Sequence, residues 1–317
     1  MNYLFNPIEQ LDLTCDNPAE FQHKVIGWDI DHVQLVPGNY CINVDLVHTQ
    51  NIQLSNVTHY IGVHERGCIP PRACAISLPT LLGKDPLYYC GTILQGDECP
   101  VLISGEEFET FSSGGINYFT IVVDTDLLNR EAVLLTGHPF TAQIQSQRVI
   151  IKKQDRLRLV QKISMMMHEL KFYPQHLSTV QQELLEKQIV EQLLLSIHTP
   201  SGKKLKIPNR RQVAWKAEQL MRQNPQQQLD IKQICNRIGC SARTLHLGFK
   251  ERSGMTPGQY GRILALNGVR RQLIHLQPGE NISEIAMAWG FYHLGRFSEQ
   301  YKQLFTELPS VTIKQAG

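Results

Sequence analysis

The stretch that decides the fold is residues 231–241, which read IKQICNRIGCS. Asp230 stands directly before it and can cap a helix through its carboxylate. Gly239 can adopt the left-handed backbone conformation that ends a helix, and Ser241 can cap the next helix. The stretch therefore predicts a short helix, a tight turn and the start of a second helix.

The second helix is expected from residue 242 to about residue 252. Leu245 and Phe249 lie four residues apart and would anchor this helix in a core, which leaves its polar surface exposed. Two helices joined in this way form a helix-turn-helix unit, whose second helix enters the major groove of DNA.

The same pattern returns at an offset of 51 residues. A capping box at residues 256–259 starts a long helix between the two copies, and Asn281 with Glu284 forms a similar box at the start of the second copy. The matching positions are Ile231 with Ile282, Ile234 with Ile285, Gly239 with Gly290, and, after one extra turn residue, Leu245 with Phe297, Phe249 with Tyr301 and Pro257 with Pro309. One such pattern often arises by chance, whereas two in register indicate a duplicated DNA-binding unit.

The net charge of +2 conceals a strong asymmetry along the chain. Residues 201–317 carry 18 Lys+Arg against 7 Asp+Glu, a net charge of +11. Residues 1–200 carry 13 against 22, a net charge of −9. A basic domain attracts polyanions, and the phosphate backbone of nucleic acid is the commonest partner, although a basic surface that is merely solvated is the alternative.

Length and composition bound the class of protein. A chain of 317 residues is expected to form two or three domains, and 42% hydrophobic with 19% charged residues excludes collagen-like, disordered and disulfide-scaffold classes. No run of about 18 apolar residues predicts a membrane span, and residues 1–7 lack the basic start of a secretory signal. The eight cysteines are scattered without a CxxC pair, which predicts free thiols in a reducing cytoplasm.

Residues 30–125 alternate apolar and polar side chains between Gly and Pro residues, as strands do. Ile42, Val44 and Leu46, which follow the turn pair Pro37-Gly38, show the pattern clearly. Many short strands at this spacing predict a barrel or sandwich that encloses a cavity. Residues 1–147 are therefore expected to form a β-rich effector-sensing domain.

Between residues 148 and 198 the period changes to that of a helix. An apolar stripe there is formed by Leu185, Ile189, Leu193 and Ile197. This segment is expected either to pair two protomers or to pack against the β-rich domain. Residues 199–209, with two Pro, one Gly and three Lys, are expected to be a linker. The predicted fold class is α+β, with an all-α DNA-binding domain at residues 210–317.

The duplicated unit also resembles a known family. The resemblance is to the AraC/XylS family of bacterial transcription regulators, and it rests on Ser241, Leu245, Phe249, Gly254, Pro257 and Tyr260 in the first copy and on Ile285, Ala286, Trp289, Gly290, Phe291, Phe297, Tyr301, Pro309 and Ser310 in the second. Residues 289–295 and 301–305 look most like the regulators of ethanolamine-utilisation operons. The chain departs from common family usage at Tyr301, usually Phe, and at Thr306, where Gly is frequent.

This resemblance implies a sequence-specific transcription regulator and not an enzyme, with its two recognition helices in successive major grooves of double-stranded DNA. It also implies a small-molecule effector in the N-terminal domain, a homodimer, a contact with RNA polymerase and a cytoplasmic, nucleoid-associated location, and it favours activation over repression. Ethanolamine or a cobalamin is the effector that the subgroup suggests. No cofactor, metal or catalytic residue is expected.

Carried over position by position, the resemblance places the base-reading face of the first motif at Arg243, His246 and Leu247, with Lys250 near phosphate. In the second motif the corresponding residues are Leu294, Arg296 and Glu299. An arginine can take guanine O6 and N7 together, while Glu299 could accept from cytosine, orient Arg296 or be simply an exposed helix residue.

Five further residues are expected at the DNA surface. Ser241, Asn281 and Ser283 near helix starts and Arg262 on the connecting helix would lie near phosphate. His293 could read a base or pack beside Phe291. The aromatic residues at apolar helix positions are instead expected in the core, namely Trp215, Trp289 and Phe291.

The alternative for the N-terminal half is a cupin-like metal enzyme or metal sensor joined to the DNA-binding module. Its ligands would be drawn from His48, His59, His64 and Glu65, with Cys68 and Cys74 nearby. No His-x-His pair occurs in the chain, however, and no glycine-rich phosphate loop or catalytic triad stands out. The sequence therefore favours a regulator.

Overall fold

The computed structural model describes residues 5, 10–16, 21, 27–82, 86–144, 147–172, 178–198, 209–223, 226, 230–277 and 279–316. Its strands are β1 (Gln10–Cys15), β2 (Asp29–Gln34), β3 (Ile42–His48), β4 (Ile52–His59), β5 (Val63–Cys68), β6 (Ala73–Leu82), β7 (Tyr88–Tyr89), β8 (Thr92–Ile93), β9 (Glu98–Ile103), β10 (Glu107–Phe111), β11 (Ile116–Asp124) and β12 (Arg148–Ile150). Its helices are α2 (Thr125–Thr136), α3 (Phe140–Gln143), α4 (Lys153–Phe172), α5 (Thr179–Ser196), α6 (Asn209–Gln223), α7 (Ile231–Ile238), α8 (Ala242–Ser253), α9 (Pro257–Ile274), α10 (Ile282–Ala288), α11 (Leu294–Phe305) and α12 (Pro309–Ala316).

Two antiparallel sheets form the first half of the chain and confirm the predicted β-rich domain. One sheet has seven strands in the order β1-β3-β4-β11-β6-β9-β12, and the other has five in the order β2-β5-β10-β7-β8. Because side chains alternate along a strand, every second residue of each sheet points between the sheets. An apolar cluster there includes Ile30 and Phe108 from the five-stranded sheet and Val44 and Val122 from the seven-stranded sheet.

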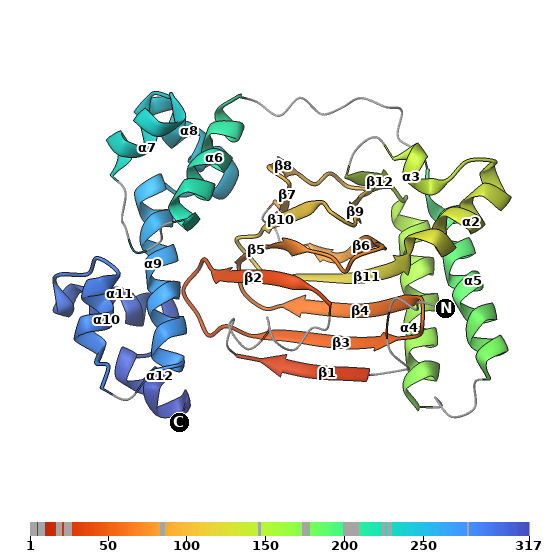
Figure 1. Cartoon of the computed structure of the whole chain (residues 1–317), viewed down its shortest axis with the longest axis horizontal. Coiled ribbons are helices and arrows are strands. Elements are labelled where there is room, and N and C mark those ends of the chain that lie inside the picture. The colour runs from red at the N-terminus through yellow and green to blue at the C-terminus, as the bar shows by residue number, and fades with distance from the viewer. Residues whose placement is uncertain are drawn as a thin grey trace.

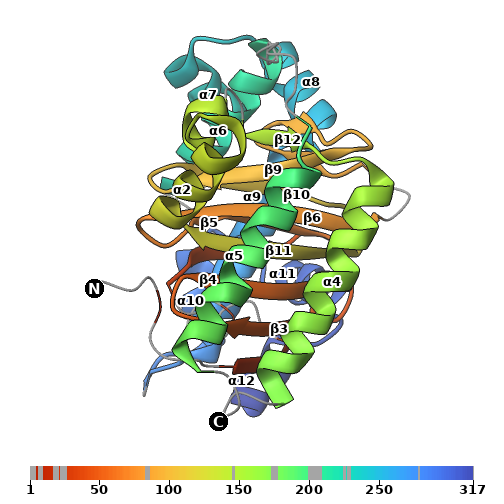
Figure 2. The same cartoon turned by 90° about the vertical axis from the view of Figure 1, so that its right-hand side faces the viewer.

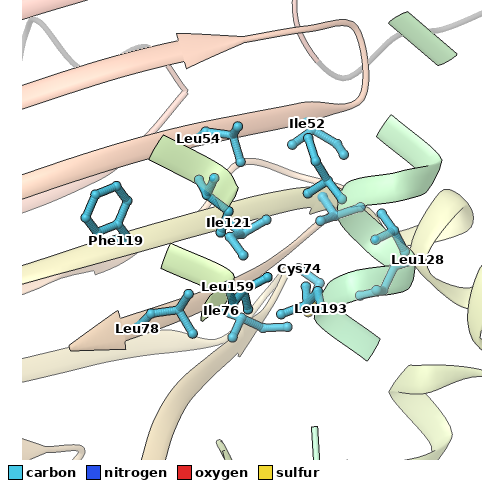
Figure 3. Packing of buried hydrophobic residues seen from close by; sticks show 14 of the residues in the cluster. Ile52, Leu54, Cys74, Ile76, Leu78, Phe119, Ile121, Leu128, Leu159 and Leu193 are labelled. Carbon is cyan, nitrogen blue, oxygen red and sulfur yellow. The ribbon is translucent and has the colours of Figure 1, made fainter. Parts of the chain in front are cut away.

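Helices α2, α4 and α5 cover the outer face of the seven-stranded sheet, and α4 and α5 lie across its strands (Figure 2). Ile52, Ile76 and Ile121 from the sheet pack against Leu159 and Leu193 from the helices (Figure 3). The apolar stripe of α5 is therefore covered by the chain's own sheet. Of the two roles predicted for this stripe, the structure supports packing, because Ile189 and Leu193 are buried within one chain.

Two predicted boundaries are placed differently by the structure. Residues 148–198 are not wholly helical, because β12 pairs with β9 and thereby extends the seven-stranded sheet. Residues 199–208 of the predicted linker lie outside the described residues, and Asn209, its last residue, already begins α6. The division into domains at these positions stays a prediction.

The second half of the chain is all-helical, as predicted, and lies on the opposite side of the sheets from α4 and α5 (Figure 1). It has two apolar cores, one around Leu245 and Phe249 and one around Phe297 and Tyr301. Helix α9 contributes to both cores and joins them. Across the described part of the chain, no helix is both long and apolar enough to cross a membrane.

Candidate nucleic-acid interface and ligand cavity

The first helix-turn-helix unit consists of α7 and α8, as the sequence predicts. Asp230 and Gln233 form a capping box at the start of α7, and Gly239 ends this helix with a φ of 71°. Ser241 caps α8 by accepting a hydrogen bond of 3.1 Å from the backbone N–H of Thr244. Leu245 is fully buried, so the register of the recognition helix is set by the core beneath it.

The predicted DNA-facing residues of this unit all lie on the surface. Arg243, His246, Leu247 and Lys250 on α8 are exposed, and so is Ser241 before it. Leu247 exposes 41% of its surface even though it is a large apolar residue. An exposed leucine on a polar recognition face can contact a thymine methyl group.

The second unit consists of α10 and α11. Asn281 caps α10 by accepting from the backbone N–H of Glu284 at 2.9 Å. On α11 the predicted residues Leu294, Arg296 and Glu299 are exposed. His293 precedes α11 and is exposed, so both predicted roles, reading a base or packing beside Phe291, stay open.

Helix α9 packs against the second unit through a close approach of its backbone to an aromatic ring. A Cβ atom built on Gly268 would lie 2.1 Å from the ring of Trp289, so only glycine fits at this position. Arg262, the predicted phosphate contact on α9, is exposed. Trp289 and Phe291 are buried as expected, whereas the prediction for Trp215 is wrong, because it exposes 43% of its surface on α6.

The first unit is bound to the five-stranded sheet by buried charged groups that the sequence analysis did not single out. Arg252 of α8 pairs with Glu109 on β10 and donates from Nε to Glu218 on α6 at 3.1 Å. Burial raises the pKa of Glu218 to about 7 and lowers that of Arg252 to about 10. Arg222 of α6 and Arg271 of α9 pair with Asp31 on β2.

His64 on β5 lies at the centre of this contact. Its Nδ1 is 2.7 Å from the hydroxyl of Tyr260 and 2.8 Å from Nη2 of Arg222, and its Nε2 is 2.8 Å from Glu109. Because a guanidinium group can only donate, Nδ1 accepts and the ring proton lies on Nε2, which donates to Glu109. Burial and the neighbouring arginines hold the pKa of His64 well below its usual value.

The second unit is bound to the same sheet through Gln34 at the end of β2 and the segment that follows it. The backbone N–H and C=O of Gln34 pair with the side-chain amide of Asn267 on α9, both at 3.0 Å. The Gln34 side chain and the backbone N–H of Gly38 donate to the carbonyl of Leu304 at the end of α11. Thr306, which takes a left-handed conformation with a φ of 62° where the first copy has Gly254, donates to Asn39.

A cavity of about 70 Å³ lies between the two sheets. Its walls are mostly apolar, with Ile30, Val44 and Phe108 among the lining residues. The polar lining residues include Glu65 and Gln53. Glu65 accepts from His32 at 3.0 Å, from Thr110 at 3.0 Å and from Tyr118 at 3.1 Å. Burial by itself would raise the pKa of Glu65, but the hydrogen bond with His32 leads the effects that lower it to about 2.

The cavity and the DNA-binding helices lie on opposite faces of the same five-stranded sheet. On β5, Glu65 lines the cavity whereas the adjacent His64 contacts α6 and α9. On β10, Thr110 lines the cavity whereas the adjacent Glu109 contacts α8. Strand alternation therefore places residues that face the cavity next to residues that contact the helices.

The ligand set of the metal alternative is not assembled. Glu65 faces the cavity, His64 faces the DNA-binding helices, and Cys74 lies in the core beneath the covering helices. Among the described residues, the close group of metal-ligand types is His64 with Glu109 and Glu218. The guanidinium group of Arg252 pairs with both of these carboxylates and supplies their counter-charge.

Acidification is expected to destabilise the chain, because His59 beside the cavity is buried and burial lowers its pKa to about 4. In the unfolded chain the pKa is about 6.5, so this stability is fully present above pH 6.5 and is lost as the pH falls through 4. The loss is on the order of 3 kcal/mol, and the lowered pKa of His64 adds to it in the same direction.

Denaturant unfolding at pH 7 and pH 4.5 should show this loss in the native chain and a smaller one in His59→Gln. The matched control is His138→Gln, because His138 is exposed. An equal loss of stability in the native chain and in His59→Gln would show that His59 does not cause it.

Comparison with known proteins gives matches in the C-terminal part of the chain. Residues 234–315 match the family model described as a helix-turn-helix domain. A probable thc operon regulatory protein of Rhodococcus erythropolis is 38% identical over 90 residues, which are 28% of this chain and 27% of that protein. A XylDLEGF operon transcriptional activator of Pseudomonas putida is 36% identical over 100 residues, 31% of this chain and 30% of that protein.

The solved structures with a similar segment include a transcriptional regulator of Chromobacterium violaceum described as containing an AraC-type DNA-binding domain. It is 30% identical, with a TM-score of 0.32, and the match covers 33% of this chain and 93% of that one. The chain spans less than a third of the length of the two curated relatives above.

Proposed function

We propose that this chain, whose residues 234–315 form an AraC-type helix-turn-helix domain, is a ligand-controlled transcription regulator that binds double-stranded DNA. The observation that carries the proposal is the pair of helix-turn-helix units, each with an exposed charged recognition helix, held by α9. The relatives named above are transcription regulators and not enzymes, and no finding favours the metal-enzyme alternative.

The proposed base-reading residues are those whose side chains are free to enter a groove. On α8 these are Arg243, His246 and Leu247, and at the start of α11 and along it they are His293, Leu294, Arg296 and Glu299. Ser241, Lys250 and Arg262 are proposed to contact phosphate. Their exposure supports these roles, and the basic charge of the region supplies the attraction.

Ligand control is proposed to act through the five-stranded sheet. A ligand in the cavity would press on Glu65 and Thr110, whose neighbours His64 and Glu109 bind α6, α8 and α9. A shift of β5 or β10 would therefore change the position of the first unit, while the segment after β2 holds the second. Both helix-turn-helix units are thus in contact with the same sheet.

Finer assignments are also proposed from the resemblance. They are activation, contact with RNA polymerase, a homodimer, a cytoplasmic, nucleoid-associated location and membership of the ethanolamine-utilisation subgroup. The subgroup rests mainly on residues 289–295 and 301–305 of the DNA-binding region, and more weakly on Trp28, Leu35, Pro37-Gly38 and Leu78-Pro79. The first two stretches lie outside the cavity, whereas Trp28 and Pro79 line it.

Replacing Arg243 or Arg296 with alanine is expected to remove sequence preference at two positions about one helical turn of DNA apart, because the two arginines lie on different recognition helices. Each change should weaken specific binding by about 1 to 3 kcal/mol and binding to random duplex by much less. Selection from a randomised library, followed by fluorescence anisotropy over a range of salt concentrations, measures both effects.

Arg130→Ala is the matched control, because Arg130 is an exposed arginine on α2, far from the DNA-binding helices in the chain and in Figure 1. It should keep the native site and affinity. If library selection returned the same motif for the native chain, Arg243→Ala and Arg296→Ala, neither arginine would read bases. Binding that did not weaken with salt would contradict the DNA-binding role itself.

A further inference from the structure

The cavity between the sheets carries a negative charge that the chain itself already solvates. Glu65 is 3% exposed, and its two carboxylate oxygens accept from three donors, His32, Thr110 and Tyr118. No Lys or Arg is found among the described residues that line the cavity. An anionic ligand would therefore meet a buried anion and no positive partner, which is strongly unfavourable in a dry site.

A cationic ligand meets the opposite difficulty. Glu65 is the carboxylate among the described lining residues, and three donors take three of its roughly four acceptor positions. An ammonium group has three N–H donors, so it would gain one position on Glu65 and would have to share the wall's hydroxyl groups, such as that of Ser55, for the others. It would exchange its full hydration in water for this incomplete set, which is unfavourable.

One donor in the cavity wall is left without a partner, and its orientation is fixed. The indole N–H of Trp28 donates to Oε1 of Gln53 at 2.8 Å. Because an indole N–H can only donate, the amide of Gln53 cannot be turned round, and Nε2 is its free end. Gln53 is fully buried, and Nε2 has no hydrogen-bond partner within the described part of the chain.

We propose that the cavity binds an uncharged, mostly apolar small molecule whose hydrogen-bond acceptor, a carbonyl, ether or hydroxyl oxygen, takes the free N–H of Gln53. This inference rests on the proposed ligand control and names the chemical class of that ligand. A cavity of about 70 Å³ can hold only a compact molecule with few heavy atoms. Ethanolamine, as a cation, and cobalamin, by its size, are both excluded from this cavity.

The test uses the full chain and four probes of four heavy atoms each, measured by isothermal titration calorimetry at pH 7. Acetone is neutral with an acceptor, isobutane is neutral without one, isopropylamine is a cation and acetate is an anion. Acetone should bind at least about tenfold more tightly than either charged probe, because burying an unpaired charge is far costlier than burying a ketone. Gln53→Leu should remove the advantage of acetone over isobutane.

A filled-cavity variant shows whether binding occurs at this site. Ser55→Phe places a ring among the lining residues and should abolish acetone binding, whereas Ser164→Phe, on the exposed face of α4, should leave it unchanged. Circular dichroism of Ser55→Phe checks that the variant folds. If the variant does not fold, the selectivity of the native chain among the four probes still tests the proposal. Tighter binding of the amine or the carboxylate, or binding of none of the probes, would overturn it.

The same samples separate this proposal from the proposed function. If acetone binds with the expected selectivity but leaves DNA affinity unchanged, the ligand class is supported and ligand control through the sheet is not. Selective binding of a charged probe, together with altered DNA affinity, overturns the ligand class and leaves the regulator intact.

Discussion

Replacing both Ile189 and Leu193 with glutamate is expected to unfold the β-rich half of the chain. The two side chains are 1% and 0% exposed and pack in the core between α5 and the seven-stranded sheet. Each change removes an apolar contact worth about 2 to 5 kcal/mol and buries a charge without a partner. The sum is comparable to the whole stability of a domain, about 5 to 15 kcal/mol, so the strand signal in circular dichroism should be lost.

The matched control lies on the other side of the same helix. Val180 and Leu184 are 74% and 56% exposed, so Val180→Glu with Leu184→Glu should leave the fold intact. Sedimentation of this control pair also tests the proposed homodimer, because dissociation would place the seam on the exposed face of α5. A folded chain with glutamate at positions 189 and 193 would show that this helix does not pack on the sheet.

Replacing Arg252 with methionine is expected to lower the free energy of unfolding by about 3 to 5 kcal/mol, although methionine fills a similar volume. The side chain of Arg252 is 3% exposed and pairs with Glu109 and Glu218, which are also buried. Without the guanidinium group Glu109 would be buried without this cationic partner, and Glu218, whose pKa burial already raises to about 7, would have to bind a proton. Both changes are costly in a medium of low dielectric. Urea unfolding at pH 7 measures the loss.

Arg210→Met is the control for removal of an arginine from an ion pair. Arg210 pairs with Glu251 while its side chain is 49% exposed, so its loss should cost at most about 1 kcal/mol. A second check is Arg252→Met combined with Glu218→Gln, which removes one of the two stranded charges. This double variant should be more stable than the sum of the single changes predicts, and strict additivity would show that the pair does not interact.

The sequence alone was sufficient for the features that depend on neighbouring residues. Helix caps, turn glycines and apolar spacing are local, and Asp230, Gly239 and Ser241 take the conformations expected of them. The second unit could be predicted for the same reason, because its cap, turn glycine and apolar positions repeat those of the first unit. Exposure of Arg243 and Arg296 followed from the helical period once the buried residues of each helix were known.

The features that only the tertiary structure decided depend on contacts between residues far apart in the chain. Whether the stripe on α5 faces a sheet or a second protomer cannot be deduced from its period, because an apolar face requires cover but does not specify what covers it. The contact of His64 with Tyr260 joins positions 196 residues apart, and that of Gln34 with Asn267 joins positions 233 apart. No local pattern marks such pairs, so the sequence predicted a DNA-binding domain and a sensing domain, and the fold alone decided that both use one sheet.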